Sequence, residues 1–227
     1  MKAPPTAETA LLLQRARFLL LDFDGPVCSI FAGTPASRVA NDLLGALRTE
    51  GVSIPERIKA TLDPFEVLRF AHSINFAAAD RTERRLREAE VAAVPTAMRT
   101  PHAADLITAW RKTGKAVAIV SNNSEAAVVA FACLHRLTLD AVVGRTSSDP
   151  SLLKPNPHLV ERAVDALGAA GPDTVLVGDS PSDIVAAKES CVNAIGYANK
   201  IGKYARLVDA GADGVVEDLG TLLDALR

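Results

Sequence analysis

The sequence predicts an α/β protein, a doubly wound, Rossmann-like parallel sheet core that carries an inserted all-helical cap domain. Short apolar runs alternate with helical patterns in the second half of the chain, which is typical of a parallel sheet covered by helices. The first apolar run ends in two acids, Asp22 and Asp24, at the edge where such sheets bind ligands. Residues 29–94 look helical throughout and are too long for a simple crossover. We therefore expect a discontinuous core at 1–28 and 95–227, and a cap at 29–94.

Composition and charge exclude several classes of function. The 227 residues are 48% hydrophobic and 23% charged, a globular mix with enough apolar material for a large core. The formal net charge of -2 lacks the basic footprint of a nucleic-acid-binding protein. No apolar run approaches the roughly 20 residues that span a bilayer, and no signal-peptide pattern is present. We expect a cytoplasmic monomer or homodimer with no nucleic-acid or membrane partner.

The first strand and the cap come first along the chain. Residues 18–22 form the apolar strand. Two stripes of residues at helical spacing then predict cap helices. The first stripe is Val39, Leu43, Leu44 and Leu47, and the second is Phe65, Leu68, His72 and Phe76. Gly51 ends the first of these helices. The densely charged segment 81–90 is typical of a solvated helix face.

The core elements follow in alternation. Apolar runs predict strands at 116–120, 141–143 and 174–177, with weaker ones at 194–195 and 214–216. Helical patterns lie between them at 103–113, 125–134, from Lys154-Pro155 to Gly168, at 183–190 and at 204–210. This order predicts a parallel sheet with helices on both faces.

Reactive polar side chains follow three of these strands. They are Asp22 with Asp24, Ser121 with Asn122, and Asp179 with Asp183. Lys154 lies in a loop before a helix. The carboxyl ends of parallel strands share one sheet edge, so we expect all of these groups to meet there. Carboxylates, a hydroxyl and an ammonium suit phosphoryl transfer to a carboxylate, assisted by a hard cation such as Mg²⁺.

Four short motifs occur in a fixed order. They are Asp22-Phe23-Asp24-Gly25 after an apolar strand, Ser121 at the end of the next strand, Lys154-Pro155, and the run from Gly178-Asp179 to Asp183. Together they resemble the haloacid dehalogenase-like hydrolase superfamily. Within this superfamily the chain resembles phosphoglycolate phosphatase and β-phosphoglucomutase-type members, which have a helical cap after the first motif. One residue departs from the pattern, because Pro26 stands where many relatives have a threonine hydroxyl.

The resemblance implies a role for each matching position. Asp22 would be the nucleophile that forms an aspartyl-phosphate, and Asp24 the general acid and base. Asp22 and Asp179 would bind Mg²⁺ through their side chains, Asp24 through its carbonyl, and Asp183 as a further ligand or anchor. The phosphoryl group would be bound by Ser121, Asn122 and Lys154. Candidate specificity residues in the cap are Phe31, Arg69 and His72.

The predicted function is that of a Mg²⁺-dependent phosphatase acting on a small phosphorylated metabolite. One alternative is a sugar-phosphate phosphomutase of the β-phosphoglucomutase type. Another is a non-catalytic phospholigand-binding protein on the same fold, although a binder need not keep both a nucleophile and an acid. A phosphoaccepting receiver domain is disfavoured by the long helical insert and by the spacing of Asp22 and Asp24.

Overall fold

The computed structural model describes residues 7–226, and its contacts divide the chain into two units. The first unit, the core, contains residues 1–29, 99–145 and 152–227, and the second, helical unit contains 30–98 and 146–151. The predicted boundaries differ from these units in three places, because residue 29 belongs to the core and residues 95–98 and 146–151 belong to the helical unit. Residues 1–6 and 227, which the predicted core also includes, lie outside the described residues.

The core is built on a parallel sheet of six strands in the order β5-β4-β1-β6-β7-β8. These strands are β1 (Phe18–Leu21), β4 (Ala116–Ser124), β5 (Ala141–Arg145), β6 (Thr174–Gly178), β7 (Asn193–Tyr197) and β8 (Gly214–Val216). β1 is central, with Leu21 in register with Ile119 of β4 and Val177 of β6. Residues that follow these three strands are therefore neighbours at one sheet edge. A separate two-stranded sheet contains β2 (Cys28–Ser29) and β3 (Met98–Arg99).

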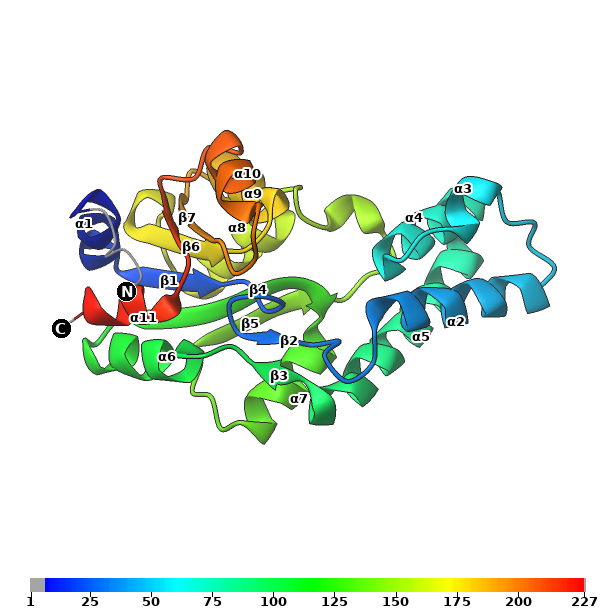
Figure 1. The fold of residues 1–227 in the computed structure, drawn as a ribbon, viewed down its shortest axis with the longest axis horizontal. Coiled ribbons are helices and arrows are strands. Elements are labelled where there is room, and N and C mark those ends of the chain that lie inside the picture. The colour runs from blue at the N-terminus through cyan, green and yellow to red at the C-terminus, as the bar shows by residue number, and fades with distance from the viewer. Residues whose placement is uncertain (1–6, 227) are drawn as a thin grey trace. The chain divides into compact units, whose positions relative to one another are not determined.

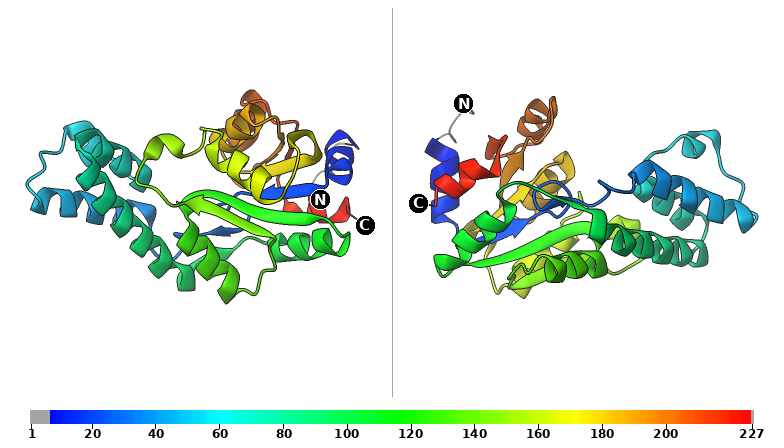
Figure 2. Two further views of the ribbon diagram at one scale, coloured as in Figure 1. Left: turned by 180° about the vertical axis from the view of Figure 1, so that it is seen from behind. Right: turned by 60° about the horizontal axis from the view of Figure 1, so that its bottom comes forward.

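Helices cover both faces of the six-stranded sheet, which confirms the doubly wound α/β fold. Figures 1 and 2 show α6 and α7 on one face and α8, α9 and α10 on the other. The core helices are α1 (Ala7–Arg15), α6 (Ala103–Lys112), α7 (Glu125–Leu134), α8 (His158–Ala166), α9 (Pro181–Glu189), α10 (Lys203–Asp209) and α11 (Leu219–Asp224). Short 3-10 turns occur at Val94–Thr96, Pro150–Leu152 and Gly171–Asp173. The strands β1 and β6 are almost wholly buried, because helices on both sides exclude water from them.

The strand after α6 is longer than the apolar run predicts. The predicted strand stops at Val120, whereas β4 continues to Ser124. Its pairing with β5 shifts register between Val120 and Ser124, and Ser124 then aligns with Arg145. A register shift of this kind bends a strand and re-aims its side chains. Ser121 and Asn122 therefore lie within an irregular continuation of the strand.

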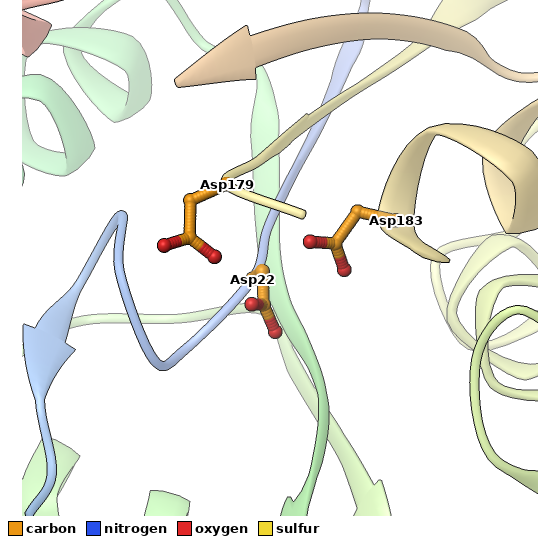
Figure 3. Close-up of side chains that lie close together, drawn as sticks. All are labelled: Asp22, Asp179 and Asp183. Atoms are coloured by element: carbon orange, nitrogen blue, oxygen red, sulfur yellow. The ribbon is translucent and has the colours of Figure 1, made fainter. Parts of the chain in front are cut away.

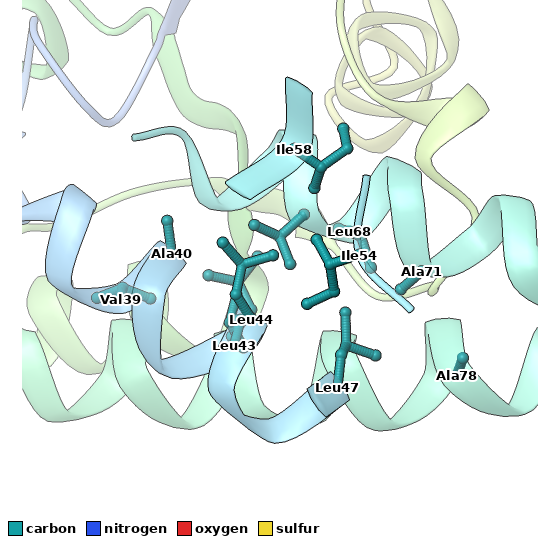
Figure 4. Close-up of a cluster of buried hydrophobic side chains, with 12 residues drawn as sticks. Val39, Ala40, Leu43, Leu44, Leu47, Ile54, Ile58, Leu68, Ala71 and Ala78 are labelled. Atoms are coloured by element: carbon teal, nitrogen blue, oxygen red, sulfur yellow. The ribbon is translucent and has the colours of Figure 1, made fainter. Parts of the chain in front are cut away.

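The helical unit has its own apolar core. It contains α2 (Ala36–Thr49), α3 (Glu56–Lys59), α4 (Pro64–Ile74) and α5 (Phe76–Ala93). The first predicted stripe lies in the cluster of Figure 4, where Leu43, Leu44 and Leu47 of α2 face Leu68 of α4. The second stripe is only partly right, because Phe76 begins α5 and is exposed. Asp63 caps α4 through a 2.8 Å bond from the Phe65 N–H.

The charged segment of α5 is only partly a solvated face, so this prediction is corrected. Arg81, Arg84 and Arg85 are exposed, but Glu83 and Glu90 are buried. Arg81 and Arg85 both donate to Glu50 at the end of α2, which ties the two helices together. The helical period explains the split, because positions 83, 86 and 90 face the same side as the apolar residues. Within the part of the chain that the structure describes, no helix is both long and apolar enough to cross a bilayer.

Candidate active site

Asp22 lies directly after the central strand, at the point where three strands end together. Its N–H donates to the carbonyl of Val177 at 2.9 Å, which continues the pairing with β6 for one more residue. Its side chain is buried, with 8% of the residue exposed. The central position of β1 explains the burial, since neighbouring strands flank the residue on both sides.

Lys154 is the cation of this buried site. Its ammonium donates to Oδ1 of Asp22 at 2.8 Å, to Oδ1 of Asp183 at 2.5 Å and to the carbonyl of Val120 at 3.1 Å. Burial alone would lower the pKa of Lys154, but Asp183 and Asp22 outweigh it and raise the pKa above its usual range. Lys154 is therefore a fixed positive charge between two carboxylates.

Asp183 is held by the start of α9. Its Oδ2 accepts from the N–H of Ser180 at 3.0 Å and from the Ser180 hydroxyl at 2.6 Å, while the Ser180 hydroxyl in turn accepts from the Asp183 N–H. This reciprocal pair is a capping box. The close approach also requires Gly178, because a Cβ there would lie 2.3 Å from the Asp183 Cβ. The motif thus fixes one carboxylate oxygen and leaves the other directed to Lys154.

Asp179 has partners from a region that carries no predicted site residue. Its Oδ2 is contacted by the ammonium of Lys203, the first residue of α10, and accepts from Asn199 Nδ2 at 3.3 Å. Both residues follow β7, the strand next to β6. Extending the strand-end rule to the weak apolar run at 194–195 would have found them.

The three acids form one cluster. One carboxylate oxygen from each of Asp22, Asp179 and Asp183 lies within 4.8 Å of the others, and Figure 3 shows the three side chains close together. Burial is the largest cause that raises the pKa of Asp22 to about 8, Asp183 and Asp179 add to it, and Lys154 opposes them. Burial likewise raises the pKa of Asp179, against the opposing effect of Lys203. A donor set made only of carboxylate oxygens suits a hard divalent cation, which would also offset this repulsion.

Ser121 and Asn122 lie beside the cluster in different roles. The Ser121 hydroxyl is buried and accepts from the N–H of Asn123 at 3.1 Å. The Asn122 side chain clamps the backbone of Lys154, accepting from its N–H at 2.8 Å and donating to its carbonyl at 3.2 Å. Asn122 therefore positions Lys154 in this structure, and its predicted contact with a phosphoryl group stays a prediction.

Asp24 lies two residues beyond Asp22, in a tight turn. It is exposed, unlike Asp22, and its backbone forms a bridge with Cys28. Gly25 has φ of 123°, and a Cβ there would lie 2.3 Å from Cγ of Asp179, so only glycine fits. The Thr100 hydroxyl donates to the Gly25 carbonyl at 2.5 Å. A hydroxyl from another segment thus bonds the loop that contains Pro26.

The cap candidates lie in the helical unit and have local contacts there. Phe31 packs against the apolar cluster of that unit. Arg69 donates to Glu66 at 2.7 Å, and His72 lies 4.0 Å from Asp149. Their predicted role in substrate choice stays a prediction.

Comparisons with known proteins agree with the family resemblance that the sequence predicts. A family model described as haloacid dehalogenase-like hydrolase matches residues 19–190. Pyrophosphatase PpaX of Halalkalibacterium halodurans is 38% identical over 78 residues, 34% of this chain and 35% of the relative. A plasmid-encoded phosphoglycolate phosphatase of Cupriavidus necator is 31% identical over 120 residues, 51% of this chain and 50% of the relative. The matched segments thus span at most about half the length of these curated relatives.

A solved structure shares the fold. CbbY from Rhodobacter sphaeroides, in complex with phosphate, superposes with a TM-score of 0.69 at 22% identity, covering 93% of this chain and 99% of that one. At this identity the superposition shows that the α/β fold is the same.

Proposed function

The chain belongs to the haloacid dehalogenase-like hydrolases, and on that premise we propose that it is a Mg²⁺-dependent phosphatase for a small phosphorylated metabolite. The observation that carries this proposal is the buried contact of Lys154 with Asp22 and Asp183, beside Asp179. A nucleophilic carboxylate needs such charge compensation before a phosphate group can approach it. The names of PpaX and the phosphoglycolate phosphatase support a phosphate ester or anhydride as the substrate class.

Asp22 is the proposed nucleophile. Lys154 holds Oδ1 of Asp22, which orients Oδ2 for attack on phosphorus. The bond from Oδ2 to phosphorus forms as the bond to the leaving oxygen breaks, and the product on the protein is an aspartyl-phosphate. The Lys154 ammonium and the Ser121 hydroxyl stabilise the charge on the phosphoryl oxygens. Because Asn122 fixes the Lys154 backbone, the ammonium needs little reorganisation during the reaction.

Asp24 is the proposed general acid and base. It first gives its proton to the leaving oxygen, and then accepts a proton from the water that attacks the aspartyl-phosphate. This second attack breaks the bond between Asp22 and phosphorus and releases inorganic phosphate. Lys154 and a bound cation would favour the ionised form of Asp22 needed for attack, whereas the exposed Asp24 can exchange protons with water.

Three carboxylates would hold the cation. Asp22, Asp179 and Asp183 offer the oxygen ligands, with the Asp24 carbonyl as a proposed fourth. When bound, the divalent cation neutralises negative charge on the phosphoryl group and on the acids. Magnesium is the proposed ion because carboxylates combined with water ligands are its usual environment.

The test is Asp22→Asn with p-nitrophenyl phosphate as substrate. The amide is not a nucleophile, so kcat should fall by at least about 10³-fold while the melting temperature shows an intact fold. Asp209→Asn, on the exposed side of α10, is the control and should keep full activity. Phosphate release without an added sugar bisphosphate separates a phosphatase from a phosphomutase. Turnover retained by Asp22→Asn would refute the nucleophile.

A further inference from the structure

A cavity of about 420 Å³ lies in the core alongside α6, apart from the acidic cluster. One stripe of α6 lines it, with Ala104, Ile107, Thr108 and Arg111 at helical spacing. The facing wall comes from the segment after α7, at 135–138. The two wall segments precede β4 and β5 in the chain, so the cavity lies by the amino ends of these strands. The acids follow the carboxyl ends of β1 and β6, at the opposite edge of the sheet. The volume falls within the range of small-molecule sites.

The cavity is cationic. Arg111, Lys112 and Arg136 are among its lining residues, and none of the lining residues is acidic. Arg111 is neutralised in part by Asp140, which it contacts through Nη1. Lys112 and Arg136 therefore leave a positive excess beside the apolar side chains of Ile107 and Leu137. A ligand that fits this wall has an anionic head and an apolar body.

Arg136 occupies a position where glycine is usual. It follows α7 with φ of 53°, and the bonds from Arg136 N to Cys133 O and from Leu137 N to Ala132 O form a Schellman motif. A side chain is disfavoured in this left-handed conformation, so packing of the helix end does not explain an arginine.

His135 adds a polar atom without a hydrogen-bond partner to the cavity wall. Its Nε2 is buried and has no hydrogen-bond partner among the described residues. Its ring packs on Phe131 with 4.2 Å between centroids, which fixes the imidazole at the cavity wall. A buried nitrogen without a hydrogen-bond partner is unfavourable unless a ligand or a water molecule forms a hydrogen bond with it.

We propose that this cavity binds a small organic anion, a phosphate monoester or a carboxylate with an apolar body, through Arg136 and Lys112. The site is independent of the proposed phosphatase activity, because it shares no residue with the acidic cluster. The basic residues in the last turn of α6, and Arg136 directly after α7, also complement the carboxyl ends of those helices.

Methyl NMR of the full chain tests the proposal with three probes of similar shape. They are phenylphosphonate, benzoate and neutral benzamide, titrated to about 10 mM, a range in which fragments of this size bind. We expect saturable shifts of the Ile107 and Leu137 methyl signals with an anionic probe and none with benzamide. The Ile184 methyl, next to Asp183, reports separately on binding at the acidic cluster. The relative affinities of the two anions decide between a phosphate and a carboxylate head.

Arg136→Gly should weaken binding of the anion by about tenfold, because one charge-assisted contact is lost. It should not lower the melting temperature. Lys112→Gln should also weaken binding of the anion. The matched control is Cys191→Gly, since Cys191 ends α9 in the same Schellman geometry with φ of 56° and lies outside the cavity. Absence of saturable shifts, equal shifts with benzamide, or unchanged affinity in Arg136→Gly would overturn the proposal.

Discussion

The ammonium of Lys154 lies 2.8 Å from Oδ1 of Asp22, although 132 residues separate the two along the chain. The same nitrogen lies 2.5 Å from Oδ1 of Asp183, so one cation contacts two buried acidic side chains. A buried acid without such a partner would be strongly unfavourable in its ionised form. The contact thus links the stability of the core to the chemistry of its site.

Replacing Lys154 by Met should destabilise the fold. Two buried acids would lose their shared cation, and we expect a loss of about 3–5 kcal/mol in unfolding free energy without divalent cations. Urea denaturation in EDTA measures it. Lys188→Met is the control, because its ion pair with Asp213 is partly exposed and is worth at most about 1 kcal/mol. Equal losses in the two variants would contradict the role of Lys154.

Asp24→Asn should affect poor leaving groups most. General acid catalysis contributes roughly 10²–10⁴-fold when the leaving oxygen needs a proton, and little when it does not. The kcat for an alkyl phosphate should therefore fall much further than that for p-nitrophenyl phosphate. Steady-state kinetics with both substrates measure the ratio. Parallel losses would argue against proton donation by Asp24.

Lys203→Met should tighten the binding of Mg²⁺. The Lys203 ammonium contacts Oδ2 of Asp179 and so competes with a cation for that carboxylate. We expect an increase of about tenfold in affinity, or about 1.4 kcal/mol. Isothermal titration calorimetry on protein stripped with EDTA measures it, with Lys200→Met as a control outside this contact. The stripped wild-type protein should also be inactive until Mg²⁺ is added. Weaker binding in Lys203→Met would mean that the lysine supports the metal site instead.

The stability of metal-free protein should depend on pH through Asp22. An aspartic acid in water has a pKa of 3.8, whereas in the folded chain burial raises the pKa of Asp22 to about 8. Between these two pKa values the folded chain keeps a proton on Asp22 that the unfolded chain has lost. The free energy of unfolding of wild type therefore falls as the pH rises, by at most about 1.4 kcal/mol per pH unit. The Asn side chain does not titrate. The stability of Asp22→Asn relative to wild type, measured in EDTA from pH 5 to 8, should therefore rise with pH. A difference that stays constant would show that Asp22 is ionised throughout.

Much of the fold and of the site could be predicted because the signals are local. Apolar runs mark buried strands, and the alternation with helices predicts a parallel sheet. The rule that strand ends share one edge then brings Asp22, Asp179 and Asp183 together, as the structure does. The amino-acid sequence by itself thus determined the α/β class, the helical insert and the position of the acidic cluster.

Only the tertiary structure decided which partners these groups take. Lys203 and Asn199 reach Asp179 because β7 lies next to β6, and Asn122 bonds the Lys154 backbone because β4 is irregular after Val120. The cavity along α6 likewise exists only where the segment after α7 faces that helix. Such contacts depend on side-chain directions across elements that are distant in sequence, and periodicity along one element carries no information about them.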